Sequence, residues 1–400
     1  MKKKQSVWVI SHSCGGPTIG PNMRVYLLGK NLSKKNIIRI YASRYFHKYL
    51  TQPKRYINYS ERFKIIYLVN LKYKNFIGQF LNQLIFPVFL FIKLLKDLKN
   101  YPPKVIILSS PPPFAIISIT PFVKIFKIKL IVDVRDLWPE ILIALGNNTL
   151  PFKAYLLIVK KTVALAYNQA NHIISVKQGD LDYIKINYKT KAKLHFIPNA
   201  YTEEKTVFDD SFRHPFLDGK FFVVTYTGAL SDYYTLDELI DVAKKCLANN
   251  LKIRFLIAGG GKDLEKYKNK TVNLSNIDFI GQKQKTVINS ILAKADIAYL
   301  PLKENSFNNH GISTNKLYDY MFHALPVLGL YQNNYDIVEK HEFGIVEKSY
   351  CSNSLYKKLI DLYEMDTDRR KAMGLNGKIL LEKEFLPEYI TQKFEKIINE

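Results

Sequence analysis

The sequence predicts an α/β protein with two domains, each a parallel β-sheet covered by helices in the Rossmann-like manner. Short apolar runs alternate with helical patterns along the whole 400-residue chain, and 47% of its residues are hydrophobic, which is enough for two cores. The alternation breaks at IPNAYTEE, residues 197–204, where proline, asparagine and charge replace the strand pattern. We therefore expect one domain over residues 1–200 and a second over residues 201–385.

Ten apolar runs are expected to form the strands, five in each domain. In chain order they are VWVIS, VIILSS, KLIVDV, HIISV and KLHFIP, and then FFVVTYTG, RFLIAG, IDFIG, IAYLPL and PVLGLY. Open parallel sheets bind ligands at the carboxyl ends of their strands, so a site is expected in the turns that follow these runs.

The positive charge of the chain lies in its first half. The net charge is +24; residues 1–200 hold 32 Lys and Arg against 7 Asp and Glu, whereas residues 201–400 hold 27 against 28. A basic domain attracts phosphorylated substrates, anionic lipid or nucleic acid, and the charge does not choose among them. Three cysteines without metal-ligand spacing indicate a reducing compartment, and the short apolar run near the basic start reads as a strand and not as a signal peptide.

Residues 75–99 combine an apolar stripe with lysines at their far end. The apolar side chains recur at helical spacing and comprise Ile77, Phe80, Leu81, Leu84, Val88, Phe91 and Leu95. Polar residues and a proline interrupt the run, which disfavours a helix that crosses a bilayer. A buried core helix fits the same spacing. The lysines favour an amphipathic helix that rests on an anionic membrane surface.

The most informative turn is GISTNKLYDYMFHALPVLG, residues 311–329, where a loop of small residues leads into a helix. A helix that opens near Asn315 would present four backbone N–H groups to a phosphate, those of Gly311, Ile312, Ser313 and Thr314. One face of this helix is expected to carry Lys316, Asp319, Tyr320 and His323. The lysine can pair with a diphosphate and Asp319 can accept hydrogen bonds from ribose hydroxyls, which together predict a nucleotide site. A capped helix with a solvated Lys–Asp pair is the alternative.

Two turns of the first domain are further candidates. After the first strand, Gly15 and Gly16 would let backbone approach a ligand, and Arg24 could project from the following helix. This turn lacks the GxGxxG fingerprint, which disfavours a dinucleotide-binding dehydrogenase, and a plain tight turn fits it equally well. In VDVRDLWPE the end of an apolar strand is crowded with charge, which favours a polar-substrate site; its charged residues are Asp133, Arg135, Asp136 and Glu140.

Three other turns give weaker signals. YTGALSDYYT ends a strand at Gly228 and is expected to begin a helix over residues 232–235, without a basic residue for phosphate. Residues 259–261, three glycines, read more as a strand-to-helix turn than as a phosphate loop. GDLD, with Asp180 and Asp182, is similar to a DxD metal motif but is expected to begin a surface helix. No other metal cluster is evident.

Taken in order, these motifs resemble a bacterial glycosyltransferase of family 4, which has the GT-B architecture of two facing Rossmann-like domains. The resemblance covers nearly the whole chain and rests on CGGP, SSPPPF, VDVRDLWPE, IPNAY, DFIG and STNKLYDYMFHALPVLG. RDLWP and NKLYDYM look like the subgroup that adds N-acetylhexosamine-type sugars to lipid-linked surface polysaccharides. The resemblance implies donor binding in the second domain, acceptor binding in the first, no bound metal or other cofactor, and a C-terminal helix over residues 386–400 that returns to the first domain.

The resemblance also assigns site residues. The family's glycine turn near the donor diphosphate falls on Gly15 and Gly16, its catalytic-region strand end on Arg135 and Asp136, and its DFIG turn contributes Ile280.

Two family positions differ in this chain. The two family glutamates eight positions apart correspond to Gly311 and Asp319, so the contact to the sugar has no side chain here. The Arg and Lys that usually hold the diphosphate are replaced by Ala229 and by Tyr233 or Tyr234. Lys316 and the amides of residues 311–314 are therefore expected to supply most of the charge stabilisation.

The expected reaction transfers a sugar, with retention, from a nucleotide diphosphate donor, UDP in the first instance, to a lipid-linked saccharide in O-antigen or capsule biosynthesis. Lys316, the helix amides and Arg24 would stabilise the leaving diphosphate, while Asp136 and Arg135 position the acceptor. The expected location is the cytoplasmic face of the inner membrane. A nucleotide-sugar 2-epimerase of the same architecture is one alternative. A nucleic-acid-binding protein is another, disfavoured by the neutral second half and by the lack of a recognisable nucleic-acid motif.

Overall fold

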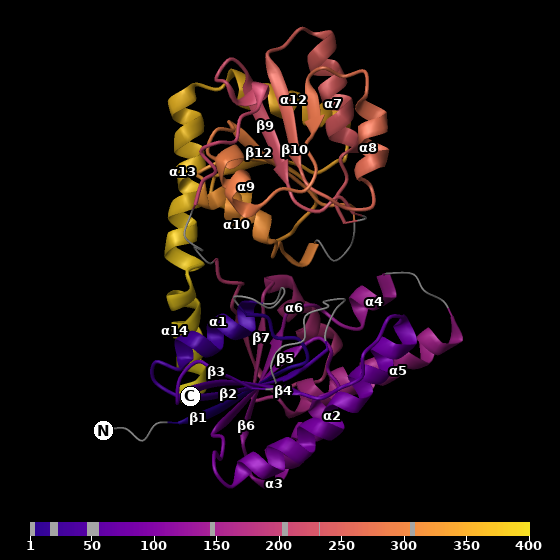
Figure 1. Cartoon of the computed structure of the whole chain (residues 1–400), viewed down its shortest axis with the longest axis vertical. Helices are drawn as coiled ribbons and strands as arrows, with labels where there is room; N and C mark the ends of the chain where they lie inside the picture. The colour runs from indigo at the N-terminus through magenta and orange to yellow at the C-terminus, as the bar shows by residue number, and fades with distance from the viewer. Residues whose placement is uncertain are drawn as a thin grey trace. The chain divides into compact units, whose positions relative to one another are not determined.

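Two β-sheets organise the chain, one in each of two units (Figure 1). The computed structural model describes residues 5–16, 23–45, 56–144, 149–201, 207–231, 233–304 and 309–400. The first unit comprises Met1–Ala200 together with Pro387–Glu400, and the second comprises Tyr201–Leu386. Both are Rossmann-like, with parallel strands flanked by helices, which confirms the predicted fold class.

The first unit is built on an eight-stranded sheet in the order β3-β4-β2-β1-β5-β6-β7-β8. Neighbouring strands run parallel, except that β3 and β4 pair antiparallel. The strands are β1 (Ser6–Ser11), β2 (Ile37–Ser43), β3 (Tyr56–Asn58), β4 (Phe63–Leu68), β5 (Val105–Ser110), β6 (Lys129–Val134), β7 (His172–Ser175) and β8 (Lys193–Phe196). The helices are α1 (Met23–Leu32), α2 (Phe76–Leu98), α3 (Ile116–Ile125), α4 (Glu140–Ala144), α5 (Leu150–Gln169), α6 (Gln178–Asn187) and α14 (Pro387–Asn399).

Strands β2, β3 and β4 lie outside the runs predicted from the sequence. β2 and β4 each carry a basic residue within an otherwise apolar stretch, Arg39 and Lys64. The buried Arg39 guanidinium lies 4.3 Å from the centre of the Tyr101 ring, and the Lys64 ammonium lies 4.8 Å from that of Tyr56 in β3. Aromatic rings compensate these charges through cation–π contacts. A search for uninterrupted apolar runs therefore misses both strands.

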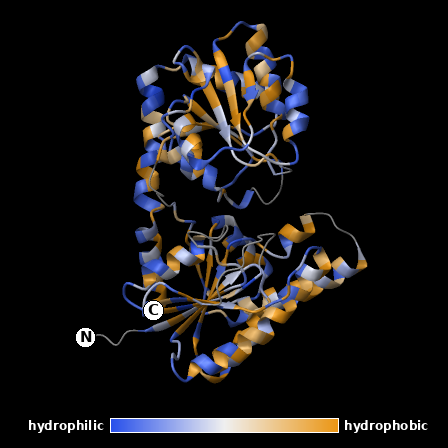
Figure 2. Cartoon of the chain, viewed as in Figure 1, coloured by the Kyte–Doolittle hydropathy of each residue, from blue (hydrophilic) through white to orange (hydrophobic). Residues whose placement is uncertain are grey.

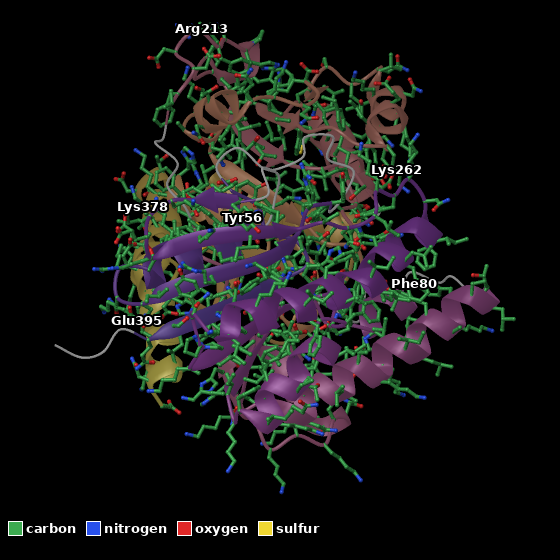
Figure 3. All side chains as sticks on the ribbon, turned by 60° about the horizontal axis from the view of Figure 1, so that its bottom comes forward. Tyr56, Phe80, Arg213, Lys262, Lys378 and Glu395 are labelled. Carbon is green, nitrogen blue, oxygen red and sulfur yellow. The ribbon has the colours of Figure 1, made fainter. Side chains whose placement is uncertain are left out.

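The C-terminal helix α14 packs on the first unit beside α1, as expected from the sequence (Figure 1). It contributes Ile390, Phe394, Ile397 and Ile398 to the core on that face of the sheet. Glu395, labelled in Figure 3, accepts a hydrogen bond from Lys35 at 2.7 Å. The polypeptide thus starts and ends in the same unit.

Helix α2 covers the other face of this sheet together with α3 and α5, and it turns a polar stripe inward. Asn82 is fully buried and its Oδ1 lies 2.8 Å from Nε2 of His12, at the end of β1. The Gln83 carbonyl oxygen accepts from the Tyr155 hydroxyl of α5, and Asp97 accepts from Tyr41. The polar residues that interrupt the apolar run are therefore the ones that fix α2 to the sheet.

The second unit has a six-stranded parallel sheet in the order β11-β10-β9-β12-β13-β14. The strands are β9 (Phe222–Thr227), β10 (Ile253–Ala258), β11 (Ile277–Phe279), β12 (Ile297–Pro301), β13 (Val327–Leu330) and β14 (Gly344–Glu347). The helices are α7 (Asp237–Ala248), α8 (Leu264–Thr271), α9 (Lys285–Leu292), α10 (Asn315–Phe322), α11 (Ile337–Lys340), α12 (Ser352–Glu364) and α13 (Thr367–Glu384), with a short 3₁₀ turn η1 (Pro215–Leu217) before β9. The edge strand β14 is short and was not predicted.

Candidate functional site

The loop into α10 has the geometry expected of an anion cradle. Gly311 adopts a positive φ of 126°, and α10 opens at Asn315 after Thr314, which has extended backbone. The Thr314 side chain makes no capping hydrogen bond to the helix. The first-turn N–H groups of an α-helix have no partner within the helix, and the helix dipole favours an anion at this end. The predicted start of this helix is confirmed.

Lys316 lies in a cage of tyrosines at the start of α10. Its ammonium donates a hydrogen bond to the Tyr226 hydroxyl at 3.0 Å and lies 3.1 Å from the centre of the Tyr234 ring. Only 8% of Lys316 is exposed, and no carboxylate among the described residues forms an ion pair with it. Because burial removes water from the ammonium without supplying a counter-ion, the pKa of Lys316 falls to about 7.

A glycine makes room for this lysine. Gly228, directly after β9, has a φ of 145°, and a Cβ atom there would lie 2.6 Å from Cε of Lys316. The turn that contains Gly228 continues β9 alongside β10, since its N–H donates to the Ala258 carbonyl at 3.0 Å. The Gly228 carbonyl in turn would lie 1.9 Å from a Cβ at Gly259. A Cβ at Gly261 would likewise lie 2.1 Å from the Leu230 carbonyl oxygen, so Gly259 and Gly261 are required for close backbone packing, which is what a strand-to-helix turn needs.

The four polar side chains of α10 lie on one broad face, as their spacing predicts, but they meet two different sets of partners. Lys316 and Tyr320 point to the sheet, where the Tyr320 hydroxyl donates to the Tyr299 carbonyl and accepts from the Thr227 N–H. Asp319 and His323 point to α9, where they meet Lys285 and Asn289. The helical period spreads the four positions over about 100° of the helix, with 316 and 320 at the edge toward the sheet and 319 and 323 at the edge toward α9.

The charges of the α9-facing pair are set by burial. Desolvation raises the pKa of Asp319, and the nearby Lys285 ammonium works against that rise. Desolvation also lowers the pKa of His323 to about 4, with Lys285 and Lys378 adding to the effect. His323 is therefore neutral near pH 7. Asp319 already has a cationic partner, which a ribose hydroxyl would have to share.

The turn after β9 holds the basic residue that its own sequence lacks, because Lys316 comes to it from 90 residues further along the chain. Helix α7 begins at Asp237, later than the predicted 232–235; Asp232 lies outside the described residues. Sequence reasoning missed Tyr226, whose hydroxyl accepts from Lys316 and donates to the Ala229 carbonyl. The signal in the sequence that could have identified Tyr226 is its place near the end of β9, directly before the turn. Ile280, after β11, is half-buried, and its N–H donates to the Ile257 carbonyl.

In the first unit, Arg24 is held by a buried carboxylate. Its Nη2 lies 2.8 Å from Oδ1 of Asp133 in β6 and also donates to the Ile197 carbonyl, while Nη1 donates to the Pro198 carbonyl and to Oδ1 of Asn199. These contacts join α1, β6 and the chain leaving β8, which is a structural role. Arg24 has few donors left for a diphosphate.

The glycine turn after β1 is buried. Gly15 and Gly16 follow the free thiol of Cys14, whose pKa is raised by burial to about 12. A Cβ on Gly16 would lie 3.3 Å from the Tyr59 hydroxyl, so a side chain fits only if Tyr59 shifts. A donor-binding role of these glycines stays a prediction.

The charged cluster of VDVRDLWPE separates into individual roles. Asp133 binds Arg24, and Glu140 accepts hydrogen bonds from the hydroxyls of Tyr183 and Tyr188.

Arg135 and Asp136 remain as candidates at the end of β6. Arg135 Nη2 donates to the Pro111 carbonyl at 3.0 Å, while its Nε is buried without a partner among the described residues. Burial lowers the pKa of Arg135, against which Asp136 and Asp133 act, whereas the side chain of Asp136 is exposed. This pair belongs to the first unit and the Lys316 cage to the second.

The GDLD motif has a structural role. α6 begins at Gln178, and Asp180 in its first turn is buried and accepts a hydrogen bond from the Ser175 hydroxyl at 2.9 Å. The prediction of an exposed helix start is therefore wrong for Asp180. Within the described ranges, no three His, Cys, Asp or Glu side chains form a group that could hold a metal ion.

The chain has the GT-B fold. Similar solved structures include sucrose-phosphate synthase from Thermosynechococcus elongatus, with a TM-score of 0.72 and 14% identity over 99% of this chain and 98% of that chain. HepE of Anabaena in complex with UDP and glucose has a TM-score of 0.65 and 14% identity over 99% of both chains. WaaG, a glycosyltransferase involved in lipopolysaccharide biosynthesis, has a TM-score of 0.63 and 13% identity over 98% of this chain and 99% of that one.

The second unit also has a family match in sequence. Residues 222–365 match the family of glycosyl transferases group 1, whereas no curated protein matches the chain. The matched segment begins at β9 and includes Gly228, Lys316 and Asp319. The family match thus covers the part of the chain that holds the tyrosine cage.

Proposed function

We propose that this protein is a glycosyltransferase that moves a sugar from a UDP-sugar to a lipid-linked saccharide. The observation that carries the proposal is the buried Lys316 ammonium, which has no carboxylate partner among the described residues and lies at the N-terminus of α10. The ammonium of such a site has no counter-ion within the described part of the chain, and a bound anion would supply one. Support for a nucleotide donor comes from the match of residues 222–365 to glycosyl transferases group 1 and from HepE, a similar structure that binds UDP.

The chemistry follows from where charge develops. As the glycosidic bond breaks, the nucleoside diphosphate gathers negative charge, and Lys316 with the first-turn amides of α10 would stabilise it most strongly in the transition state. Asp319 would accept hydrogen bonds from the ribose. We expect retention of configuration, an N-acetylhexosamine-type sugar and no requirement for a bound metal, as the resemblance to family 4 implies.

The first unit would supply the acceptor side. Asp136 is exposed at the end of β6, and Arg135 beside it has an unpartnered buried Nε. We assign this pair to positioning the acceptor hydroxyl. Neither residue is needed for donor binding in this scheme, so their loss should leave UDP affinity in place.

A surface of the first unit supports a lipid-linked acceptor. Helix α2 exposes Ile77 and Val88 at 63% and 58%, on the side away from its polar stripe (Figure 2). Among the described helices, α2 is long and apolar enough to cross a membrane, but this is weak evidence and its inner side chains are committed to the sheet. We name the outer side of α2, α3 and α5 the apolar outer face. Its large exposed side chains are Ile77, Leu81, Val88, Phe89, Ile92, Leu95, Ile117, Ile125, Phe126, Leu150, Leu157 and Ile158.

The three helices form one continuous layer. Phe80 of α2, labelled in Figure 3, packs edge-on against Tyr155 of α5 with ring centres 4.9 Å apart. Phe91 of α2 meets Phe122 of α3 at 5.9 Å. Exposed apolar area of this extent is uncommon on a soluble protein and marks an interaction surface.

Lysines stand on the same helix faces as these apolar side chains. Seven of them are exposed and form no ion pair with a carboxylate in the described chain, namely Lys96, Lys99, Lys124, Lys127, Lys153, Lys160 and Lys161. Apolar side chains that enter the acyl boundary while lysines reach headgroups are the pattern of an interfacial helix. We propose that the apolar outer face docks on an anionic bilayer at the cytoplasmic side of the inner membrane.

Turnover assays test the activity. UDP-sugars and GDP-sugars are screened for transfer to membrane-extracted lipid acceptors with EDTA present. Lys316→Ala should lower the rate of transfer at least about 100-fold, as loss of a transition-state contact of this kind does, whereas exposed Lys294→Ala serves as the matched control. Equal rates in the two variants would sink the assignment of Lys316. A 2-epimerised sugar nucleotide formed without acceptor would establish the epimerase alternative instead.

Vesicle flotation tests the docking. The protein should float with vesicles that contain phosphatidylglycerol, bind less to pure phosphatidylcholine, and lose binding as salt screens the lysines. Leu81→Glu with Leu157→Glu should abolish flotation, whereas Val272→Glu, at an exposed apolar position of the second unit, should not. Equal flotation of both variants would contradict the proposal, as would a dimer that survives dilution and buries the same face.

A further inference from the structure

The Lys316 cage contains an unusual set of neighbours for a buried cation. β9 contributes Tyr226, whose ring and hydroxyl contact the ammonium, and the turn after β9 contributes Tyr234. Asp319 is paired with Lys285 of α9, and the Tyr320 hydroxyl is bonded to backbone of β9 and β12. The described groups packed around the ammonium are therefore phenols and rings, with no available carboxylate.

Such an environment leaves the lysine near the balance point between its two forms. Aromatic faces attract an ammonium by about 0.5–2 kcal/mol, and the Tyr226 hydroxyl accepts one of its three N–H bonds. Neither replaces the hydration that a charge loses on burial. The rings and the hydroxyl therefore offset only part of the desolvation, and the pKa of Lys316 is lowered.

We propose that Tyr226 and Tyr234 are positioning residues that hold Lys316 ready for the donor, and that binding of the nucleoside diphosphate draws a proton onto this lysine. The proton comes from solution: a neutral amine plus a proton gives the ammonium that pairs with the diphosphate, and the proton returns to solution when the nucleotide leaves. This inference rests on the proposed function, because it takes the diphosphate as the missing counter-ion.

Two properties follow for the empty and filled sites. Without nucleotide, Lys316 titrates around neutral pH. With nucleotide, the adjacent anion favours the charged form and moves the titration upward. Binding at pH 8 should therefore take up close to one proton, and affinity should fall up to about tenfold per pH unit above the empty-site midpoint.

Two measurements on the full chain test this. First, NMR of ¹³C-labelled lysine side chains follows the titration of Lys316, assigned with Lys316→Arg. Second, calorimetry with UDP at pH 8 in buffers of different ionisation enthalpy gives the number of protons taken up. The terminal phosphate of UDP is already ionised at this pH, since second phosphate pKa values lie near 6, so the uptake reports on the protein.

Variants separate positioning from mere packing. Tyr226→Phe keeps the ring but removes the acceptor of the ammonium, so the Lys316 midpoint should fall. Tyr356→Phe, which removes a hydroxyl on α12 that accepts from Asn249, should leave it unchanged. Lys316→Arg, charged at all these pH values, should bind UDP without proton uptake.

The outcomes distinguish the two levels of inference. UDP binding by the unmodified protein without proton uptake, or a Lys316 midpoint near 10, overturns this inference and leaves the proposed function standing. Absence of UDP binding at any pH overturns both. Uptake of close to one proton that disappears in Lys316→Arg supports it.

Discussion

Arg24 and Asp133 form a salt bridge that is buried on both sides, with Nη2 2.8 Å from Oδ1 and side-chain exposures of 7% and 1%. The carboxylate also accepts a hydrogen bond from the Ser109 hydroxyl. The guanidinium donates to the carbonyls of Ile197 and Pro198, in the chain that leaves β8. The pair therefore joins α1, β6 and the chain that leaves β8. It also occupies the N–H groups that Arg24 would otherwise offer to a phosphate.

Breaking this pair on one side should destabilise the first unit. Arg24→Met leaves the buried Asp133 carboxylate without its cation, and loss of one partner of a buried pair costs about 3–5 kcal/mol. Urea unfolding followed by a probe in the first unit measures the change. The double variant Arg24→Met with Asp133→Leu should recover much of the loss; a double variant as unstable as the sum of the singles would refute the pairwise account.

Lys316→Met should stabilise the second unit while it abolishes transfer. Burial lowers the pKa of Lys316 to about 7 in the folded chain, whereas a lysine in the unfolded chain has its ordinary pKa of about 10.4. Between these two pKa values the unfolded chain binds one more proton than the folded chain, so the free energy of unfolding rises with pH. The destabilisation by Lys316 therefore has its full size below about pH 7. The free energy of unfolding of the variant should therefore be roughly 2–4 kcal/mol higher at pH 7. This range takes about 1.4 kcal/mol for each unit of pKa and subtracts a part for relaxation of the protein around the charge.

The gain should fade toward pH 10, which urea midpoints compared with the unmodified protein across pH will show. A gain that is the same at pH 7 and pH 10 would mean that the effect is one of packing. A residue that lowers the stability of the fold is expected in a binding site, because it is kept for the ligand that it binds.

Gly228→Ala should impair catalysis through the lysine. The new Cβ would lie 2.6 Å from Cε of Lys316, so the side chain must leave its cage, and kcat/KM should fall at least about tenfold. Gly219→Ala is the matched control, because Gly219 also has a positive φ, of 85°, but open space around it. Both variants should lose similar stability, of order 1 kcal/mol. Kinetics that respond equally to both would contradict the contact.

Asn82→Leu should destabilise the first unit although it makes α2 more apolar. Its Oδ1 accepts a hydrogen bond from Nε2 of His12 and its Nδ2 donates to the Leu71 carbonyl, and loss of these bonds leaves the buried partners unsatisfied at a cost of about 1–3 kcal/mol. Leu81→Asn, one residue away and exposed, should change stability by less than about 0.5 kcal/mol in the absence of lipid. Thermal unfolding of the two variants measures the contrast.

The sequence was sufficient for the fold because local patterns repeat: apolar runs, helical spacing and turn residues agreed across both units. It failed for β2 and β4, where a basic side chain is balanced by an aromatic ring from another segment. That compensation depends on tertiary contacts and leaves no mark in a single run. Helix α10 was found with its correct start because a small-residue loop before an amphipathic stretch is a local signal.

The site was predicted less fully than the fold. Lys316 was identified from its helix, yet its partners Tyr226 and Tyr234 lie more than 80 residues earlier, and no spacing rule joins them. Arg24 was a candidate phosphate ligand because it follows the glycine turn. The sequence does not show that it is paired with Asp133, which lies in β6. Polar residues of α2 that weakened the helix pattern were read as interruptions, whereas they point inward.

Helix α2 carries apolar side chains on both sides: Phe86, Leu90 and Leu94 lie in the core beside the buried Asn82, and others such as Val88 are exposed on the outside. The consequence concerns the protein in the test tube. Away from lipid, the outer side chains have nothing but water or each other to cover them, so the purified chain should self-associate as salt screens its net charge of +24 and should disperse in mild detergent. Its yield and solubility will then depend on a bilayer substitute more than on the stability of either unit.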